Sequence, residues 1–352
     1  MDALLIKNQN FETIIDGKKV KLFTLSNKNG ITVQLTNYGA YLVSILTPDK
    51  DGTYADVLMG YNSMDGFLRD NAFMGCLVGP VANRITKGKF NLDGKEYTLF
   101  TGKGKSHLHS TPDGFHKEVF DAQQINNKVI MTLKVPDMKT GFPGNKIVTA
   151  IYELLPNDVL RLTFTLISDK KTLCNMTNHA YFNLTGDESK SILDHKLMVN
   201  SGSITLLNQE QNPTGEIKSV ENTPFDFREL TLIGKRIDED DEQLHFGKGY
   251  DENFILSKNK GEFGLAVHLS ETKSKRFLKI YTNQPAIQVY TSNYQNSSAV
   301  GKSGKFHKLR CSIALEPQKF PDAPNHPDFP SIIIEPGEVY EHISEYVFGV
   351  EK

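Results

Sequence analysis

Residues 159–166, with the sequence VLRLTFTL, alternate apolar and polar side chains with a period of two. Successive side chains of an extended strand point to opposite faces, so the apolar residues share one face and the polar residues share the other. The apolar positions are Leu160, Leu162, Phe164 and Leu166. Residues 129–135 and 147–154 show the same alternation. These three segments predict half-buried β-strands.

Turn signals separate such segments throughout the chain. Asp93-Gly94 lies between two short apolar segments, which is a strong signal for a β-hairpin. Helical periodicity is weak and predicts only short helical turns in residues 63–71 and 238–244. Many short strands with dense turns, without a repeat or a linker, predict an all-β fold. We expect one large, mostly antiparallel β-sandwich domain that spans residues 1–352.

The charge composition argues against several classes of partner. The chain has 40 Lys and Arg against 42 Asp and Glu, and no basic block stands out. Neither a nucleic acid nor a membrane surface is therefore expected to bind. No apolar run approaches the roughly 18 residues of a membrane span, and residues 1–8 do not resemble a signal peptide.

The three cysteines, Cys76, Cys174 and Cys311, are widely spaced and have apolar neighbours. An odd number at such spacing is typical of buried thiols in a reducing compartment and not of a disulfide framework or a zinc site. We therefore expect a cytoplasmic protein, which could be a monomer or a homodimer.

Glu316 follows an apolar run, residues 311–315, and precedes a loop rich in proline. The run reads as a buried strand, which would place Glu316 at the strand's end and half in the interior. A carboxylate there is costly unless it is paired or used. An ion pair at the surface is the simpler interpretation, and a catalytic role is the alternative.

His179 lies in residues 177–184, with the sequence TNHAYFNL. A lone histidine among apolar residues is usually a core residue whose ring nitrogens are hydrogen-bonded within the protein. The polar neighbours Thr177, Asn178 and Asn183 instead suggest that this histidine lines a cavity. An imidazole and a carboxylate that meet across a cavity form an acid/base pair.

His107 and His109 are two positions apart, and on a strand both imidazoles would face one cavity. With Asp113 nearby, they could hold a metal ion, although no second segment has suitable ligand spacing. Purely structural histidines and direct contacts to a ligand are the other two interpretations.

Three further polar residues lie in apolar surroundings. Arg84 could donate forked hydrogen bonds to hydroxyls or a carboxylate, or could be ion-paired at a strand end. Asp251 follows a glycine-containing turn, where it could simply cap the turn. Gln288 would be an inward amide that needs a polar partner. Without a phosphate-binding glycine loop or a nucleophile elbow, this set of groups suits a neutral polyhydroxyl ligand that undergoes proton transfer.

These residues lie in segments that resemble the aldose 1-epimerases, or galactose mutarotases, over nearly the whole chain. The matching segments, in order, are Asn37-Tyr38-Gly39-Ala40, Ala82-Asn83-Arg84-Ile85 with Gly88-Lys89-Phe90, Leu108-His109, residues 177–184, Gly249-Tyr250-Asp251, residues 284–290, and residues 315–330 with Pro336-Gly337-Glu338. The histidine and glutamate motifs are specific, and several independent segments in the right order make a chance match improbable.

The resemblance implies a large β-sandwich with an open sugar cleft, the galactose mutarotase-like supersandwich, and no cofactor or metal. It implies that Glu316 is the general base for the anomeric hydroxyl and that His179 is the general acid for the ring oxygen. It also implies that a set of polar side chains contacts the sugar. These residues are Asn83, Arg84, His109, Asp251 and Gln288. An alternative that stays open is that His109 supplies the acid.

The chain departs from the family's pattern at four places near these motifs. Pro80 stands where the family has an arginine, Ser110 and Thr111 stand where it has two glycines, and His116 replaces an aspartate. Phe120 stands where the family has a tryptophan, and the chain has no tryptophan at all. We therefore hypothesise that the preferred substrate is a different aldose, or a disaccharide with a free reducing end, and not galactose or glucose.

Three other functions compete with the epimerase. A lectin of the same fold would bind sugar without catalysis, and it would need neither His179 nor Glu316 specifically. A glycoside hydrolase would use Glu316 and Asp251 as its two carboxylates. A metal enzyme would be built on His107 and His109.

Overall fold

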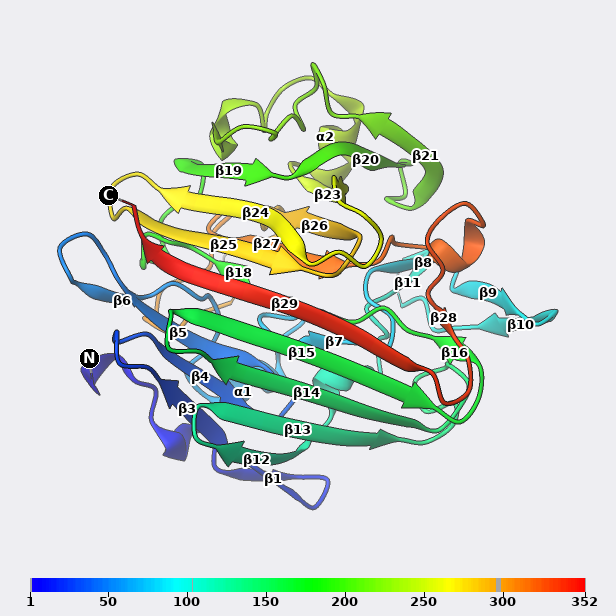
Figure 1. The fold of residues 1–352 in the computed structure, drawn as a ribbon, viewed down its shortest axis with the longest axis horizontal. Coiled ribbons are helices and arrows are strands. Elements are labelled where there is room, and N and C mark those ends of the chain that lie inside the picture. Colours follow the sequence, from blue (N-terminus) through cyan, green and yellow to red (C-terminus); the bar gives the residue numbers. More distant parts are fainter. Residues whose placement is uncertain (1, 103, 296–298, 352) are drawn as a thin grey trace.

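The computed structural model describes residues 2–102, 104–295 and 299–351. Its largest element is a nine-stranded sheet whose strands cross Figure 1 from β12 at the bottom to β19 near the top. The strand order is β12 (Asp121–Ile125), β13 (Lys128–Val135), β14 (Lys146–Leu154), β15 (Val159–Ser168), β29 (Val339–Val350), β25 (Arg276–Thr282), β24 (Gly264–Glu271), β19 (His195–Val199) and β22 (Thr231–Leu232).

Two smaller sheets and several two-stranded ribbons complete the sandwich. The six-stranded sheet has the order β18 (Tyr181–Phe182), β27 (Ile313–Gln318), β26 (Ala286–Tyr290), β23 (Asp251–Leu256), β20 (Ser201–Leu207) and β21 (Pro213–Ser219). The four-stranded sheet contains β3 (Leu22–Ser26), β4 (Thr32–Thr36), β5 (Leu42–Pro48) and β6 (Tyr54–Asp56). The ribbons pair β1 (Thr13–Ile15) with β2 (Lys18–Val20), β7 (Leu77–Val78) with β17 (Thr177–Asn178), β8 (Arg84–Thr86) with β11 (Ser106–Leu108), β9 (Lys89–Leu92) with β10 (Lys95–Thr98), and β16 (Thr172–Leu173) with β28 (Ile333–Ile334).

Helices are short. The α-helices are α1 (Met64–Leu68) and α2 (Glu242–Gly247), and the 3-10 helices are η1 (Asp2–Leu4), η2 (Asn8–Asn10), η3 (Phe115–Lys117), η4 (Ile233–Lys235) and η5 (Ala323–Asn325). The turn predicted for residues 63–71 contains α1. The turn predicted for residues 238–244 starts too early, because Asp241 caps the first N–H groups of α2 and the helix begins after it. Among the described residues, no helix has the length and apolarity to cross a membrane.

The all-β, mostly antiparallel sandwich predicted from the sequence is confirmed. In β15, Leu160, Leu162, Phe164 and Leu166 are buried while the intervening residues are partly exposed. Asp93-Gly94 forms the tight turn between β9 and β10, and both residues adopt the positive φ that this turn requires (51° and 77°).

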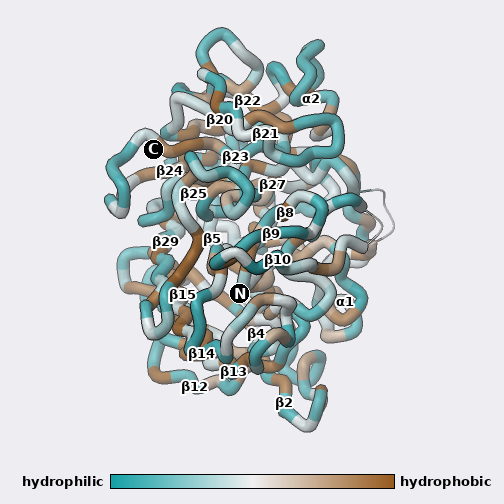
Figure 2. Tube along the Cα trace, turned by 90° about the vertical axis from the view of Figure 1, so that its right-hand side faces the viewer, coloured by the Kyte–Doolittle hydropathy of each residue, from teal (hydrophilic) through white to brown (hydrophobic). Residues whose placement is uncertain are grey.

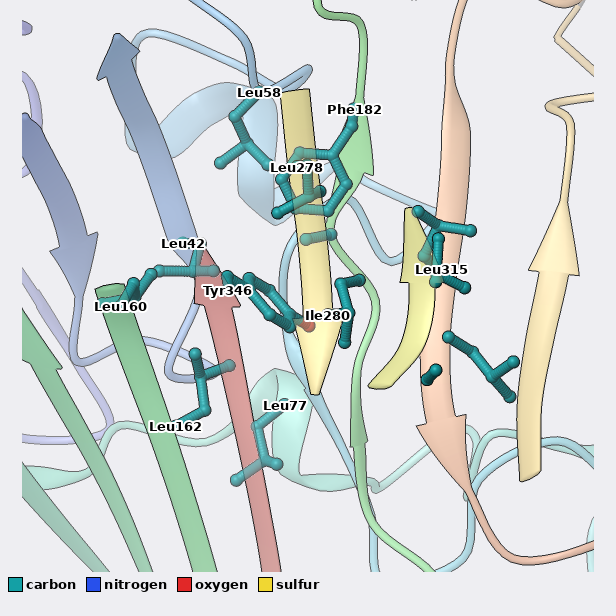
Figure 3. Close-up of a cluster of buried hydrophobic side chains, with 14 of the residues drawn as sticks. Leu42, Leu58, Leu77, Leu160, Leu162, Phe182, Leu278, Ile280, Leu315 and Tyr346 are labelled. Carbon is teal, nitrogen blue, oxygen red and sulfur yellow. The ribbon is translucent and has the colours of Figure 1, made fainter. Parts of the chain in front are cut away.

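The buried faces of the three large sheets meet in one hydrophobic cluster. Figure 3 shows side chains from each sheet in it, with Leu162 and Tyr346 from the nine-stranded sheet, Leu315 from the six-stranded sheet and Leu42 from the four-stranded sheet. Along the chain, brown hydrophobic stretches fall mainly on strands and teal hydrophilic ones on the peripheral loops (Figure 2). This packed interior holds the strands of the six-stranded sheet, from which the candidate site is built.

Strand β27 runs further than the sequence suggests. It continues through Glu316 and Pro317 to Gln318, so Glu316 lies within the strand and is buried, and not half-exposed at its end. Beyond Ala314, β26 is the only strand among the described residues that pairs with β27, and a proline is tolerated where a strand has a free edge. The register of these strands places Gln288 directly beside Glu316.

Candidate active site

A cavity of about 710 Å³ opens beside the six-stranded sheet. It brings together seven side chains that were singled out above, from six segments that lie far apart in sequence. They are Asn83 and Arg84 at β8, His109 after β11, His179 between β17 and β18, Asp251 on β23, Gln288 on β26 and Glu316 on β27.

Glu316 contributes a carboxyl group that is almost completely shielded from solvent. Only 1 % of its surface is exposed, and burial raises the pKa of this carboxyl well above its usual value, with the nearby Asp251 adding to the effect. Within the described part of the chain, its Oε2 atom has no hydrogen-bond partner. A buried oxygen without a partner at a cavity wall is available to a ligand hydroxyl.

His179 faces Glu316 across a short gap, with 3.4 Å between its Nε2 and Glu316 Oε1. Its ring packs against those of Tyr181, His109 and Phe73, at centroid distances of 4.9, 5.2 and 6.0 Å. Burial lowers the pKa of this imidazole to about 3. Burial therefore disfavours the charged form of both groups, the imidazolium of His179 and the carboxylate of Glu316.

His109 follows the last residue of β11 with a left-handed backbone conformation (φ 51°). Its Nδ1 accepts a hydrogen bond from the Asn83 N–H at 3.1 Å, so the ring proton lies on Nε2. Burial, with the positive charges of nearby groups, lowers its pKa well below the usual value. His109 is therefore a neutral N–H donor at the cavity wall.

The expectation that His107 and His109 face one cavity is wrong, because the strand ends between them. His107 points elsewhere, with its Nδ1 at 2.7 Å from the Phe100 carbonyl and its ring against Phe142. Across residues 2–102, 104–295 and 299–351, no three His, Cys, Asp or Glu side chains cluster as metal ligands. The geometry therefore removes the basis of the metal-site alternative at His107 and His109.

Arg84 and Asn83 form one polar corner of the cavity. The Asn83 side chain accepts a hydrogen bond from the Arg84 N–H at 2.9 Å. The Arg84 guanidinium donates from Nη2 to Gln211 Oε1 at 2.7 Å. The partner of this guanidinium is a neutral amide and not the carboxylate that the simpler interpretation of a strand-end ion pair requires.

Asp251 and Gln288 form a second polar part of the cavity wall. The Gln288 Nε2 donates to Asp251 Oδ1 at 2.8 Å, and its Oε1 is left without a partner among the described residues. Burial raises the pKa of the Asp251 carboxyl, although Arg84 and the bond from Gln288 oppose this shift. Asp251 is thus a hydrogen-bonded residue of the cavity wall and not a turn cap.

Phe73 is a cavity residue that the sequence did not reveal. Its ring packs against His109 and His116, at centroid distances of 4.8 and 5.0 Å, as well as against His179. The loop that carries it is held by buried Asp70, whose carboxylate accepts from the N–H groups of Ala72 and Met74 at 2.9 and 2.8 Å. The sequence signal that could have revealed Phe73 is Asp70, three positions before it, because its carboxylate bonds to the backbone N–H groups on both sides of Phe73.

The sequence departures lie around the cavity in different ways. Ser110 bonds to the backbone N–H and carbonyl of Val81, both at 2.9 Å, and does not line the cavity. His116 lies behind Phe73 and is buried. Thr111 lines a smaller neighbouring hollow. Ser110, Thr111 and His116 therefore do not line the catalytic cavity themselves, and His116 contacts it through Phe73.

Comparisons with known proteins agree on one family. The model of the family described as aldose 1-epimerase matches residues 21–347. The galactose mutarotase of Bos taurus is 35% identical over 91% of this chain and 92% of its own length. The aldose 1-epimerase of Escherichia coli K12 is 34% identical over 96% of this chain and 97% of its own length.

Solved structures also match along nearly the whole chain. An aldose epimerase homologue from C. elegans superimposes with a TM-score of 0.88 at 29% identity, covering 95% of this chain and 100% of that one. A galactose 1-epimerase from Lactobacillus acidophilus gives a TM-score of 0.83 at 28% identity, with 97% of each chain covered.

Proposed function

The chain belongs to the aldose 1-epimerase family and is an isomerase of that class, and we propose that Glu316 and His179 are its general base and general acid. The observation that carries this assignment is the 3.4 Å approach of His179 Nε2 to Glu316 Oε1 inside a cavity. The two residues are separated by more than a hundred positions in sequence, and both present unpaired polar atoms among the described residues.

The reaction needs two proton transfers and no redox chemistry. Glu316 removes the proton of the anomeric hydroxyl, and His179 donates a proton to the ring oxygen as the bond between that oxygen and C1 breaks. This step opens the ring and gives the free aldehyde as an intermediate. Rotation about the C1–C2 bond and closure of the ring, with both proton transfers reversed, give the other anomer. Each such group typically contributes about 10²–10⁴-fold to the rate.

We infer that the pair shares one proton before the sugar binds, because burial disfavours the charged form of both groups. A proton that moves from Glu316 to His179 converts the neutral pair into the carboxylate and imidazolium forms. A sugar hydroxyl that donates a hydrogen bond to Glu316 favours the carboxylate, because hydrogen bonds to a charged form stabilise it. Sugar binding thus prepares the base and the acid together.

The remaining site residues suit the recognition of a neutral sugar. Arg84 and the Nε2–H of His109 are donors, Asp251 is an acceptor, and Gln288 has a free amide oxygen. We assign His109 to substrate contact and His179 to the acid role, because His179 is the imidazole that contacts Glu316. Asn83 orients both His109 and Arg84 through its backbone N–H and its side chain.

The substrate is an aldose, and the names of the relatives make galactose the first candidate. The changes around His109 and Phe73 support the alternative that another aldose, or a reducing disaccharide, is preferred. Polarimetry on freshly dissolved α-galactose, α-glucose and α-xylose tests the function directly. We expect the enzyme to accelerate the return to equilibrium rotation with at least one of them.

The same assay separates the competing functions. A rate equal to that of buffer with every sugar would favour the non-catalytic lectin. Release of a phenol from an aryl glycoside would favour the glycoside hydrolase, and the epimerase predicts no release. Full activity after exhaustive chelation would agree with a reaction that uses no metal.

We also infer that residues 1–352 form one domain, because one hydrophobic cluster draws on all three large sheets. The three buried cysteines are free thiols, which suits a reducing cytoplasm. Whether the protein is a monomer or a homodimer stays a prediction, which sedimentation at several concentrations would decide.

A further inference from the structure

Four polar side chains share one face of the six-stranded sheet beside the catalytic cavity. The strand register pairs Asn253 of β23 with Gln288 of β26, and Gln288 with Glu316 of β27. Residues paired across neighbouring strands point to the same face of a sheet. Gln288 and Glu316 line the cavity, so Asn253 lies on the cavity face as well. Gln318, two positions after Glu316 on the same strand, shares this face and completes what we call the polar group.

The opposite face of these strands supports this placement. Phe254, Ile287 and Leu315 alternate with the residues of the polar group, and all three belong to the hydrophobic cluster that joins the three large sheets. The polar group therefore points away from that cluster. On the cavity face, Ala286 pairs with Gln318 and belongs to a separate apolar cluster. Gln318 thus lies where the polar group meets apolar side chains.

Asn253 and Gln318 are buried amides without partners. Their exposed fractions are 2% and 0%, and among the described residues neither the oxygen nor the nitrogen of either amide has a hydrogen-bond partner. Neither residue lines the catalytic cavity. Buried amides are costly unless another group bonds to them, and ordered water commonly does so in protein interiors.

The unused atoms of the polar group complement one another. Glu316 Oε2 and Gln288 Oε1 are acceptors that have no partner among the described residues. The amide nitrogen of Gln288 already donates to Asp251. The free N–H groups of the polar group are therefore those of Asn253 and Gln318. A water molecule that accepts from such an amide can donate to a carboxylate, and so connects groups that are too far apart for a direct bond.

We propose that Asn253 and Gln318 hold ordered water against Glu316 and thereby stabilise its carboxylate form during the reaction. The carboxylate that accepts the proton of the sugar is charged in a dry site, and hydrogen bonds to the charged form lower that cost. Both amides act through water and do not touch the sugar, so they are positioning residues. This proposal rests on the proposed function of Glu316 as the general base.

Two substitutions remove these amides with little change in volume, Gln318→Met and Asn253→Leu. The matched control is Gln34→Met. Gln34 is a buried glutamine on β4 that bonds to the backbone of Ile6 and does not line the catalytic cavity. Polarimetry with the monosaccharide that the wild type turns over fastest gives kcat, KM and their pH dependence. Thermal unfolding verifies the fold of each variant.

We expect Gln318→Met and Asn253→Leu each to lower kcat by about tenfold with KM near wild type, because the lost hydrogen bonds support the charged form of Glu316. The alkaline limit of activity should move to higher pH, because losing these bonds disfavours the carboxylate. Gln34→Met should keep the wild-type kcat and alkaline limit and should unfold at a lower temperature, because it loses bonds within the protein.

Neither test substitution removes or adds a charge, so a shift of the alkaline limit reports on hydrogen bonding to Glu316. The other titratable groups that interact with Glu316 are unchanged in both variants, namely His179, Asp251, Cys76, Tyr181 and Tyr346.

Wild-type kcat and alkaline limit in folded Gln318→Met and Asn253→Leu would overturn the proposal, as would an equal loss of kcat in Gln34→Met. A crystal structure of the wild type provides a test that does not depend on the variants. We expect ordered water within hydrogen-bond distance of both Glu316 and Gln318, and direct protein partners for both amides would contradict this. These results leave the epimerase function intact, whereas a lack of turnover with every sugar would reject the proposed function itself.

Discussion

His179 and Glu316 lie 3.4 Å apart in the catalytic cavity, and His307 lies 3.8 Å from Glu188, which also bonds to the segment that precedes His307. Both pairs are shielded from solvent, with exposed side-chain fractions of 5% and 1% in the first and 0% and 8% in the second. The residue types, their spacing and their burial are therefore similar. Their surroundings differ.

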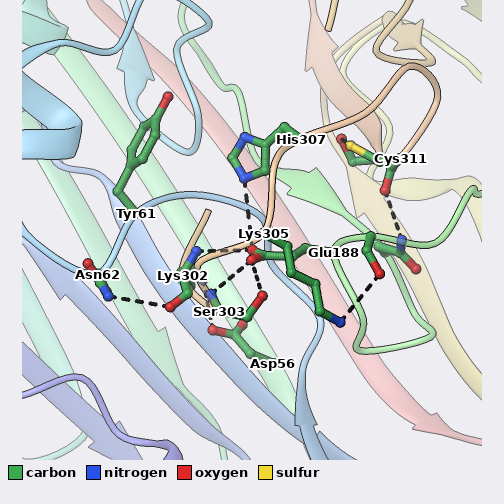
Figure 4. Close-up of polar contacts among 12 residues, drawn as sticks. Asp56, Tyr61, Asn62, Glu188, Lys302, Ser303, Lys305, His307 and Cys311 are labelled. Atoms are coloured by element: carbon green, nitrogen blue, oxygen red, sulfur yellow. Dashed lines mark hydrogen bonds and ion pairs between the residues drawn. The ribbon is translucent and has the colours of Figure 1, made fainter. Parts of the chain in front are cut away.

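Glu188 is surrounded by donors that order a loop (Figure 4). Its carboxylate accepts from the N–H groups of Lys302 and Ser303, at 3.0 and 2.8 Å, and from the Ser303 hydroxyl. Burial alone would raise the pKa of Glu188, but His307 and Ser303 outweigh it and hold this pKa below its usual value. This glutamate is a structural carboxylate.

Glu316 lacks such donors among the described residues, and burial therefore raises its pKa. The comparison shows that burial of a glutamate–histidine pair does not identify an acid/base site by itself. The two pairs differ in two respects: Glu316 keeps an oxygen without a partner among the described residues while both oxygens of Glu188 accept hydrogen bonds, and of these four residues only His179 and Glu316 line the catalytic cavity.

The largest effect should come from removing the acid or the base. We expect Glu316→Gln and His179→Asn each to reduce turnover by about 10²-fold or more, because neither amide can exchange a proton as the native group does. Polarimetry on the best monosaccharide measures the loss, and thermal unfolding verifies the fold. Glu188→Gln is the matched control and should turn over close to wild type. Near-wild-type activity of Glu316→Gln or His179→Asn would mean that its role is wrongly assigned.

The next effect is a broad pH profile. We expect the pair to be active when it holds one proton. Activity should therefore fall at low pH as the pair gains a second proton, on His179, whose pKa is about 3. It should fall at high pH as Glu316 loses the shared proton, at a pKa well above its usual value. The pH dependence of kcat/KM measures both limits.

Asp251→Asn sharpens this prediction. The charge of Asp251 helps to raise the pKa of Glu316, so its removal should move the alkaline limit to lower pH even if activity also falls. An alkaline limit that stays in place would show that Glu316 does not set it.

The smallest effect concerns stability. Replacing each of the two glutamates by glutamine should change the free energy of unfolding differently. Glu188→Gln should destabilise the protein by about 1–3 kcal/mol, because it weakens hydrogen bonds to a buried carboxylate. Glu316→Gln should leave the free energy of unfolding unchanged or increase it, because an ionised Glu316 is costly in its dry site.

The pH dependence of these stability differences follows from the directions of the two pKa shifts. The lowered pKa of Glu188 stabilises the fold above the unfolded value, and this stability is lost as the pH falls through the folded value. The raised pKa of Glu316 destabilises the fold as the pH rises above the unfolded value. Thermal unfolding between pH 4 and pH 7 measures both. If the change in unfolding temperature relative to wild type depended on pH in the same way in Glu188→Gln and Glu316→Gln, the contrast between the two pairs would be contradicted.

Local pattern was sufficient to predict the all-β class, because period two along a strand and the Asp93-Gly94 turn are properties of neighbouring residues. The resemblance to the family also selected seven residues that the structure brings to one cavity. Their catalytic and binding roles stay predictions until the variants are measured.

Tertiary structure decided the features that depend on residues far apart in sequence. The end of β11 separates His107 from His109, the pairing of β27 with β26 buries Glu316, and the Asp70 loop brings Phe73 to the imidazoles. Burial and hydrogen bonding set a carboxyl pKa, and both depend on which strands and loops surround the group. For this reason, Glu188 and Glu316, which have the same side chain, become chemically different only when the chain folds.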